Sequence, residues 1–439
     1  MSRENKKMTV MQLTILTATN MIGAGIIMLP TQLAKVGTMS ILSWLITASG
    51  ALALAYAFSK CGMYSKKTGG MGGYAEYAFG KMGNFLANYT YGVSLLIANV
   101  AIAIMAIGYI AQYVNISLSP IEVSVGTILI LWLATVMNFG GAKNTGQINS
   151  ITILGVVLPV AFVAIFGWFW FSTDIYVSAW NPNNFPVFEG VGMSISMTLW
   201  SFLGLESACA NTEAVENPER NVPIAVFGGT IVAAIIYILS TNVIAGIVPN
   251  EALLTSTGPF GLVFSQMLGG FAGKVVVLMM IVACFGSLLG WQFTIAQVFK
   301  SAADVGYFSK LFSKTTLSEV PIKGMLIITG LQSILALMTI SPSLTKQFSV
   351  LVDLAVVTNI YPYILSMVGL IAIQKSININ NAKVRTNNFI AILATIYSFY
   401  ALYSIGYELN VYGFIVTAFG WSIFCFNTYK VSSRSKSKA

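Results

Sequence analysis

Glu206 is the side chain of this 439-residue sequence whose type and position most clearly indicate chemistry. It is the one charged residue in the apolar interval 190–212. A carboxylate at the centre of a membrane span costs roughly 2.5 kcal/mol or more on insertion scales, and such acids usually face a cavity. No apolar interval holds Lys or Arg near its centre, and the sequence has no histidine. Three roles therefore stay open for Glu206: it remains protonated, it carries protons, or a cationic ligand neutralises it.

Two tryptophans favour the cationic ligand. Trp200 precedes Glu206 by six positions, and Trp291 lies deep in another apolar interval. An ammonium over an indole face gains about 2 kcal/mol or more when both are desolvated. The alternative is that these tryptophans are interfacial anchors. Asn99, in the interval 82–121, either lines the same cavity or forms a hydrogen bond between two helices.

Further polar candidates lie nearer the ends of the apolar intervals. Glu76, Tyr77, Tyr89 and Tyr91 could form a cytoplasmic vestibule for cations, or simply a solvated, tyrosine-rich membrane edge. Asp353 is interpreted as an acid at the membrane interface.

The elements that must position these residues are apolar helices. Hydrophobic residues make up 56% of the chain and charged ones 8%, whereas soluble domains carry about 25% charged residues. A helix needs roughly 20 apolar residues to cross a bilayer. About twelve transmembrane helices are predicted from the intervals 8–34, 36–59, 82–121, 123–142, 144–173, 190–212, 221–250, 275–299, 324–345, 354–374, 386–407 and 409–429.

The basic residues predict the orientation. With the N-terminus in the cytoplasm, all of the 23 Lys and Arg residues except Lys35, Lys274 and Lys346 fall on the cytoplasmic side. This bias places both termini inside a multi-pass protein of the cell inner membrane. The scattered positive charge is explained by topology and by contact with membrane lipid, not by nucleic acid.

Two spans are expected to be interrupted. Glycine costs about 1 kcal/mol in a helix interior, so Gly23 and Gly25 favour local unwinding of the first span. Gly204 stands beside Glu206 in the sixth span. The alternative is close helix packing through small residues. However, interrupted helices at matching places in two halves indicate the binding site of a transporter.

The rest of the chain leaves no room for another activity. The whole of 1–439 is one transmembrane domain, with 1–8 and 430–439 as short cytoplasmic tails. No loop is long enough for a soluble enzyme or a sensory domain, and no spacing of residues predicts a metal site or a cofactor.

Several segments resemble the amino acid–polyamine–organocation transporter superfamily over essentially the full length. Within it, the sequence is most similar to the bacterial putrescine–ornithine antiporters. The segments that carry this resemblance are Gly23-Ala24-Gly25-Ile26-Ile27-Met28-Leu29-Pro30, Gly69-Gly70-Met71-Gly72-Gly73-Tyr74-Ala75-Glu76-Tyr77, Leu203-Gly204-Leu205-Glu206-Ser207-Ala208, Glu216-Asn217-Pro218-Glu219-Arg220 and Gly286-Ser287-Leu288-Leu289-Gly290-Trp291.

The resemblance implies an all-α membrane fold with a five-plus-five inverted repeat, broken helices 1 and 6, and helices 11 and 12 outside the repeat. It also implies a substrate site, made of Gly23, Gly25, Ile26, Asn99, Trp200, Glu206 and Trp291. Relatives often have serine where this chain has Ala24, so a hydroxyl contact to an amino-acid carboxylate is missing. Putrescine, which has no carboxylate, would lose little.

The function implied is antiport of putrescine against ornithine by alternating access, with protons as a further coupled ion and a homodimer as a compatible assembly. Two alternatives stay in the same class: cadaverine with lysine, and agmatine with arginine. A membrane sensor that binds amines without moving them is the alternative of another class, and an enzyme is not expected.

Overall fold

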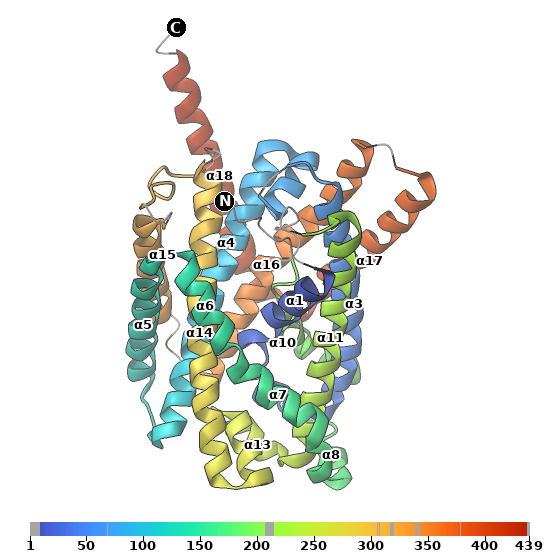
Figure 1. The fold of residues 1–439 in the computed structure, drawn as a ribbon, viewed down its shortest axis with the longest axis vertical. Coiled ribbons are helices and arrows are strands. Elements are labelled where there is room, and N and C mark those ends of the chain that lie inside the picture. Colours follow the sequence, from blue (N-terminus) through green and yellow to red (C-terminus); the bar gives the residue numbers. More distant parts are fainter. Residues whose placement is uncertain are drawn as a thin grey trace, which may run out of the picture.

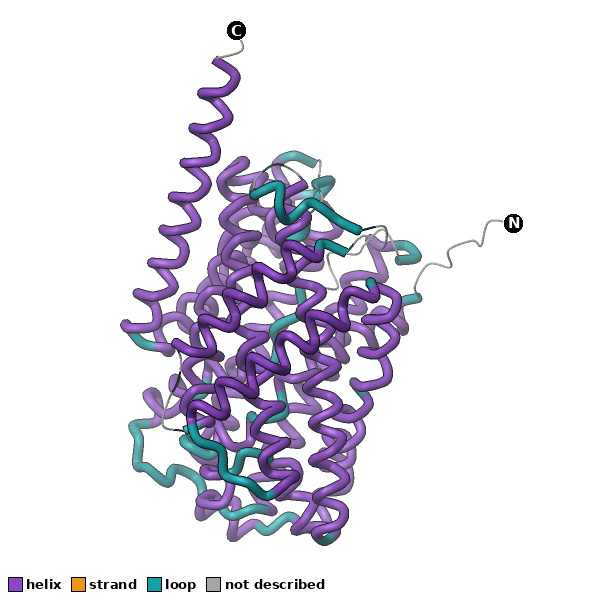
Figure 2. The backbone as a smooth tube through the Cα atoms, turned by 90° about the vertical axis from the view of Figure 1, so that its left-hand side faces the viewer, coloured by secondary structure: helices purple, strands orange, loops and turns teal. Residues whose placement is uncertain are grey.

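The structure is a computed structural model that describes residues 9–67, 69–206, 215–304, 306, 308–316, 320–338, 340, 343–377 and 379–436. Residues 1–8 and 437–439 of the expected tails lie outside this set. Within it, all regular secondary structure is helical (Figure 2). The prediction of an all-α membrane protein is confirmed.

The described part of the chain forms eighteen α-helices and three short 3-10 helices. In chain order they are α1 (Val10–Gly25), α2 (Leu29–Leu33), η1 (Gly37–Met39), α3 (Ser40–Tyr64), α4 (Met71–Val114), α5 (Pro120–Met137), η2 (Asn138–Gly140), α6 (Ala142–Thr152), α7 (Leu154–Phe166), η3 (Gly167–Trp170), α8 (Thr173–Ser178), α9 (Val187–Met193), α10 (Ile195–Trp200), α11 (Pro218–Ile247), α12 (Asn250–Thr255), α13 (Pro259–Leu268), α14 (Gly270–Asp304), α15 (Ile322–Met338), α16 (Leu344–Lys375), α17 (Asn381–Ile405) and α18 (Tyr407–Lys436).

Nine helical segments of the described chain are long and apolar enough to cross a membrane. The other three expected spans are present as shorter helices. The first is divided into α1 and α2, the sixth contains α9 and α10, and the ninth is α15, of 17 residues. The first and sixth spans are therefore short because of the expected breaks, whereas α15 is an uninterrupted apolar helix that is slightly shorter than the other nine segments.

Local sequence sets where these helices begin and bend. Ser119 and Glu122 form a capping box at the start of α5, in which each side chain accepts a hydrogen bond from the other residue's backbone N–H. Pro120 occupies the first helical position, where no N–H is needed. Pro159 lies inside α7, where the ring removes one backbone hydrogen bond.

Most helices run along the long axis of the molecule, and α4 and α16 pack against each other near its centre (Figure 1). Gly369 of α16 makes this approach possible, because a Cβ there would lie 2.3 Å from the backbone oxygen of Tyr74. In the most apolar 18-residue stretch of α4, 83% of the residues are buried, whereas in that of α18 only 11% are buried. Therefore α18 lies at the periphery, with its apolar side chains available to lipid.

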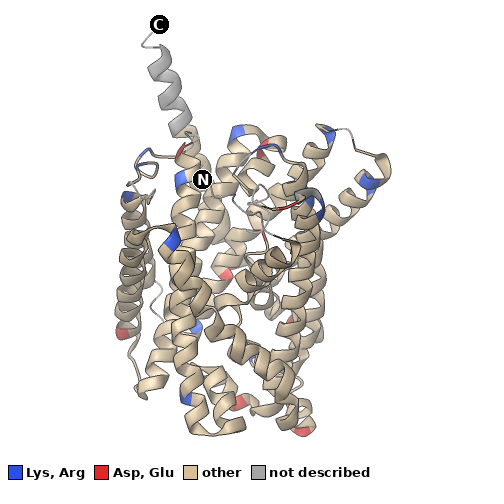
Figure 3. Cartoon of the chain, viewed as in Figure 1, with Lys and Arg blue, Asp and Glu red and all other residues tan. Residues whose placement is uncertain are grey.

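Lys and Arg residues gather toward the end from which α18 projects (Figure 3). We call this the basic end. Here α4 begins and α14 ends. The far end, where α4 ends and α16 begins, lies opposite.

Candidate binding site

The first span is interrupted where its glycines predict. Backbone angles leave the helical region at Gly23, with φ −40° and ψ −126°, and α1 ends at Gly25. Residues 26–28 form a turn before Leu29 and Pro30 start α2. The expected break of the first span is therefore confirmed.

The sixth span is interrupted at a matching depth. Helix α10 ends at Trp200, and 201–206 form turns. Gly204 has a φ of +107°, which is easily adopted only without a Cβ. The backbone between Trp200 and Glu206 thus leaves the helix, and Glu206 lies in this non-helical segment.

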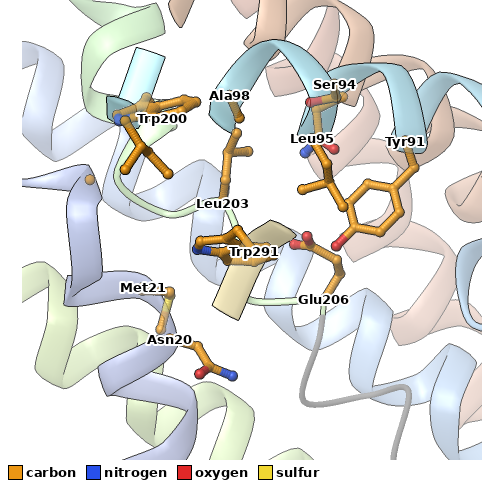
Figure 4. A pocket seen from close by; sticks show the side chains of 13 residues that line it. Asn20, Met21, Tyr91, Ser94, Leu95, Ala98, Trp200, Leu203, Glu206 and Trp291 are labelled. Atoms are coloured by element: carbon orange, nitrogen blue, oxygen red, sulfur yellow. The ribbon is translucent and has the colours of Figure 1, made fainter. Parts of the chain in front are cut away.

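The two breaks meet at a small cavity of about 40 Å³. Figure 4 shows Glu206 beside the Trp291 ring, with the Tyr91 hydroxyl pointing toward its carboxylate. The lining residues are Asn20, Met21, Gly25, Tyr91, Ser94, Leu95, Ala98, Ile102, Trp200, Leu203, Glu206, Trp291 and Asn359.

Glu206 is held by hydrogen bonds to neutral groups. Its Oε2 accepts from the Tyr363 hydroxyl at 2.7 Å and from the backbone N–H of Gly204 at 3.1 Å. The residue is only 6% exposed. Among the described residues, neither of the ion pairs includes Glu206. The acid is oriented by its neighbours, but its negative charge has no basic partner among them.

Other polar atoms around the cavity also lack partners. Asn359 is 1% exposed, and neither its amide oxygen nor its amide nitrogen forms a hydrogen bond with a described group. The same holds for Nε1 of Trp200. Buried polar groups are normally paired, so an exception within a cavity marks an atom that a ligand can use.

A second cavity of about 170 Å³ adjoins the first. The two share Asn20 and Trp291, so the Trp291 side chain lies between them. Gly23, Asn149 and Ser287 are among the residues that line only the second cavity. Trp291 is therefore placed to separate the Glu206 cavity from this neighbouring space.

Four of the expected site residues line the Glu206 cavity together: Gly25, Trp200, Glu206 and Trp291. Gly23 lines the second cavity. Ile26 is fully buried and lines neither.

Asn99 lies in a network of neutral side chains behind the cavity wall. Its amide nitrogen donates to Oε1 of Gln292 at 2.8 Å. Gln292 and Gln332 exchange amide hydrogen bonds of 2.7 and 2.9 Å, and Gln292 also donates to Thr135 and Thr329 at 3.1 and 3.0 Å. The network ties α4, α5, α14 and α15 together next to Trp291.

The expected vestibule residues do not share one location. Glu76 forms an ion pair with Lys67 at 2.9 Å. The Tyr77 hydroxyl accepts from the backbone N–H of Lys66 at 2.9 Å. Tyr89 stacks on Phe85. Only Tyr91 reaches the cavity.

Sequence reasoning missed Tyr363 and Asn359, one turn apart on α16. Both lie in the charge-free interval 354–374, where a polar amide such as Asn359 was a usable signal. Tyr363 gave no such signal, because a tyrosine in a span is ordinarily a packing residue or an anchor.

An all-helical chain in which two interrupted spans enclose a buried acid defines a membrane transport protein. Residues 8–426 match the model of the amino acid permease family, and the chain belongs to this family.

Similar proteins over nearly the full length are named as transporters and not as enzymes. The chain is 64% identical to the putrescine transporter PotE of Escherichia coli (strain K12) over 421 residues, 96% of each chain. It is 61% identical to the putrescine transporter PotE of Haemophilus influenzae over 430 residues, 98% of this chain and 99% of the relative. Identity to a cadaverine/lysine antiporter of Escherichia coli is 33% over 384 residues, 86% and 85% of the two chains.

Proposed function

We propose that this protein exchanges putrescine for ornithine across the inner membrane, and that Glu206 binds the ammonium group of either substrate. The observation that carries the proposal is the oriented carboxylate of Glu206, which lines a cavity beside two tryptophans and has no basic partner among the described residues. The relatives from Escherichia coli and Haemophilus influenzae that are 64% and 61% identical are named for putrescine.

Putrescine suits this cavity on chemical grounds. A primary ammonium has three N–H donors and no acceptor, so it requires groups such as the Glu206 carboxylate and the Asn359 amide oxygen. The indole faces of Trp200 and Trp291 attract a cation and also pack against methylene groups. A bound ammonium would offset part of the cost of burying Glu206.

Ornithine brings a carboxylate that needs donors. Two donor groups at the cavity form no hydrogen bond with a described group, the indole N–H of Trp200 and the amide nitrogen of Asn359. Both can bind a carboxylate, so the same cavity can accept the amino acid. Proton-linked uptake of putrescine is part of the proposal, because a carboxylate that binds a cation can instead bind a proton.

The gathering of Lys and Arg at one end supports the orientation. We assign the basic end to the cytoplasm and the far end to the outside. Alternating access then requires the site to open toward each end in turn.

The experiment uses proteoliposomes loaded with unlabelled ornithine and follows the uptake of labelled putrescine. We expect uptake that depends on internal ornithine and is lost in Glu206→Gln. The matched control is Glu189→Gln, which removes an exposed carboxylate from α9 and should retain uptake. Equal uptake by empty and loaded vesicles would reject antiport.

Cadaverine with lysine is the remaining pair to test, because one relative carries that name. Competition by unlabelled cadaverine against labelled putrescine decides it. Cadaverine competing more strongly than putrescine itself would favour this alternative.

A further inference from the structure

Three polar contacts join the far-end third of α16 to segments of the two interrupted spans. Gln32 of α2 donates from Nε2 to the backbone oxygen of Thr345 at 3.2 Å. Nζ of Lys35 lies 3.5 Å from Oγ of Ser349. The remaining contact is the hydroxyl of Ser196, on α10, donating to Oδ1 of Asp353 at 2.5 Å.

The positions on α16 follow a regular spacing. Thr345, Ser349 and Asp353 are each four residues apart, which places them on one face of the helix. We call these three residues and their partners Gln32, Lys35 and Ser196 the closure cluster. Its contacts reach from the first span and the sixth span to the same stripe of α16.

The closure cluster lies between the Glu206 cavity and the far end. Asn359, which lines the cavity, is six residues beyond Asp353 on α16, or about 9 Å at 1.5 Å per residue. Ser196 precedes the lining residue Trp200 by four residues, about one helical turn. The closure cluster therefore lies one to two helical turns from the lining residues, on the far-end side of the cavity.

The closure cluster contains hydrogen-bond acceptors that the donors of the cluster leave unused. Oε1 of Gln32 makes no hydrogen bond with a described group, although Gln32 is only 3% exposed. Asp353 has no ion pair among the described residues, and the one hydrogen bond from Ser196 leaves its other oxygen available. Burial lowers the pKa of Lys35 and the charge of Asp353 counteracts this, so Lys35 lies within the electrostatic reach of Asp353.

We propose that Asp353 is a second binding site for a primary alkylammonium, at which the substrate's ammonium replaces the Ser196 hydroxyl and thereby releases α10 from α16. An ammonium is a stronger hydrogen-bond donor to a carboxylate than a neutral hydroxyl is. Binding at Asp353 thus breaks the hydrogen bond that joins α10 to α16, and the ligand continues to Glu206. The inference rests on the proposed function, because it assumes a cationic substrate.

The experiment measures the KM for labelled putrescine from each face, in right-side-out and inverted membrane vesicles. Asp353→Asn is expected to raise the KM at the far-end face by about tenfold, which corresponds to one charge-assisted hydrogen bond, and to change the KM at the other face less than twofold. Glu251→Gln, which alters an exposed carboxylate on α12, is the control and should match the unmodified protein at both faces.

Ser196→Ala supplies an independent test with the opposite sign. Without the competing hydroxyl, Asp353 is open to the ammonium, so the KM at the far-end face should fall. A merely structural role for the contact predicts loss of transport in both variants. A rise in KM after Ser196→Ala would overturn the proposal, even if Asp353→Asn fails to fold.

The outcomes also separate this inference from the proposed function. If the unmodified protein does not transport putrescine, the proposed function and the inference both fail. If it does, and Asp353→Asn changes the KM equally at both faces or at neither, only the inference fails.

Discussion

Glu206 and Asp353 are two acids that connect the same pair of segments in different ways. Glu206 accepts a hydrogen bond from Tyr363 of α16, while Asp353 of α16 accepts one from Ser196. Ser196 and Glu206 are ten residues apart, and so are Asp353 and Tyr363. The 195–206 segment and α16 are thus joined by an acid and a hydroxyl at two levels.

The two acids differ in the charges around them. Lys35 lies within the electrostatic reach of Asp353, and its Nζ lies 3.5 Å from Oγ of Ser349, one turn before Asp353 on α16. Glu206 has hydroxyl, backbone and aromatic neighbours, and no ion pair among the described residues. The comparison teaches that burial alone does not distinguish the two acids. What distinguishes Glu206 is that hydroxyl and backbone donors orient its carboxyl group, with no Lys or Arg in an ion pair with it among the described residues.

Removal of the Glu206 charge is expected to have the largest effect. Glu206→Gln should lower the initial rate of putrescine uptake by about 100-fold, since a hydrogen bond to a charged group contributes up to about 3 kcal/mol. The rates are measured at one substrate concentration beside Asp353→Asn, for which about tenfold is expected. A larger loss in Asp353→Asn would reverse the roles assigned to the two acids.

The hydroxyl that orients Glu206 comes next. Tyr363→Phe keeps the ring but removes the donor to Oε2 of Glu206, so we expect kcat/KM for putrescine to fall by about tenfold at both faces of the membrane. Ser196→Ala removes the corresponding donor from Asp353 and should instead lower the KM at one face. If Ser196→Ala instead lowers kcat/KM at both faces, as Tyr363→Phe is expected to do, the two hydrogen bonds have equivalent roles.

The charge of Lys35 is expected to have a smaller effect. Lys35→Met removes a cation that competes with an ammonium for Asp353, so the KM for putrescine at the far-end face should fall by about threefold. The difference should shrink in high salt, because the pair is partly exposed to solvent. A KM unchanged at low ionic strength would contradict the electrostatic link between these residues.

Disruption of the neutral network around Gln292 is expected to have the smallest effect on binding. Gln292→Leu leaves the Asn99 amide nitrogen and the Gln332 amide oxygen without their partner, which costs about 1–3 kcal/mol for each buried group left unpaired. We expect a lower Tm in detergent, with the KM for putrescine changed less than twofold. A large change in KM at an unchanged Tm would show that this network takes part in binding the substrate.

The sequence alone identified the acid and the elements that carry it. Glu206, Trp200 and the glycine breaks stood out because a charge or a flexible residue in an apolar span has few structural explanations. The number of spans followed from the charge-free intervals for the same reason. Properties that belong to a single residue and its depth were therefore predictable.

Pairings between distant residues were not predictable. Asn99 pairs with Gln292 across 193 positions, and nothing local distinguishes an amide that meets another amide from one that lines a cavity. The candidates Glu76 and Tyr91 share α4, yet the helix is interrupted between them at Gly80, where φ is +62° and ψ is −155°. Asp353 was interpreted as an interfacial acid, and its hydrogen bond with Ser196 of α10 could not be foreseen from the sequence.

The hydrogen bond from the Gly204 N–H to Glu206 has a consequence for the strength of binding. Through it, the carboxylate stabilises the turn of its own chain, at a residue with a φ of +107°. Under the proposed function, an ammonium that draws Oε2 of Glu206 toward itself would weaken that internal bond, and part of the free energy of binding would then be used to loosen the turn. The affinity would then be lower than the contacts alone would give, and the occupied site would be better prepared to change shape and release its substrate.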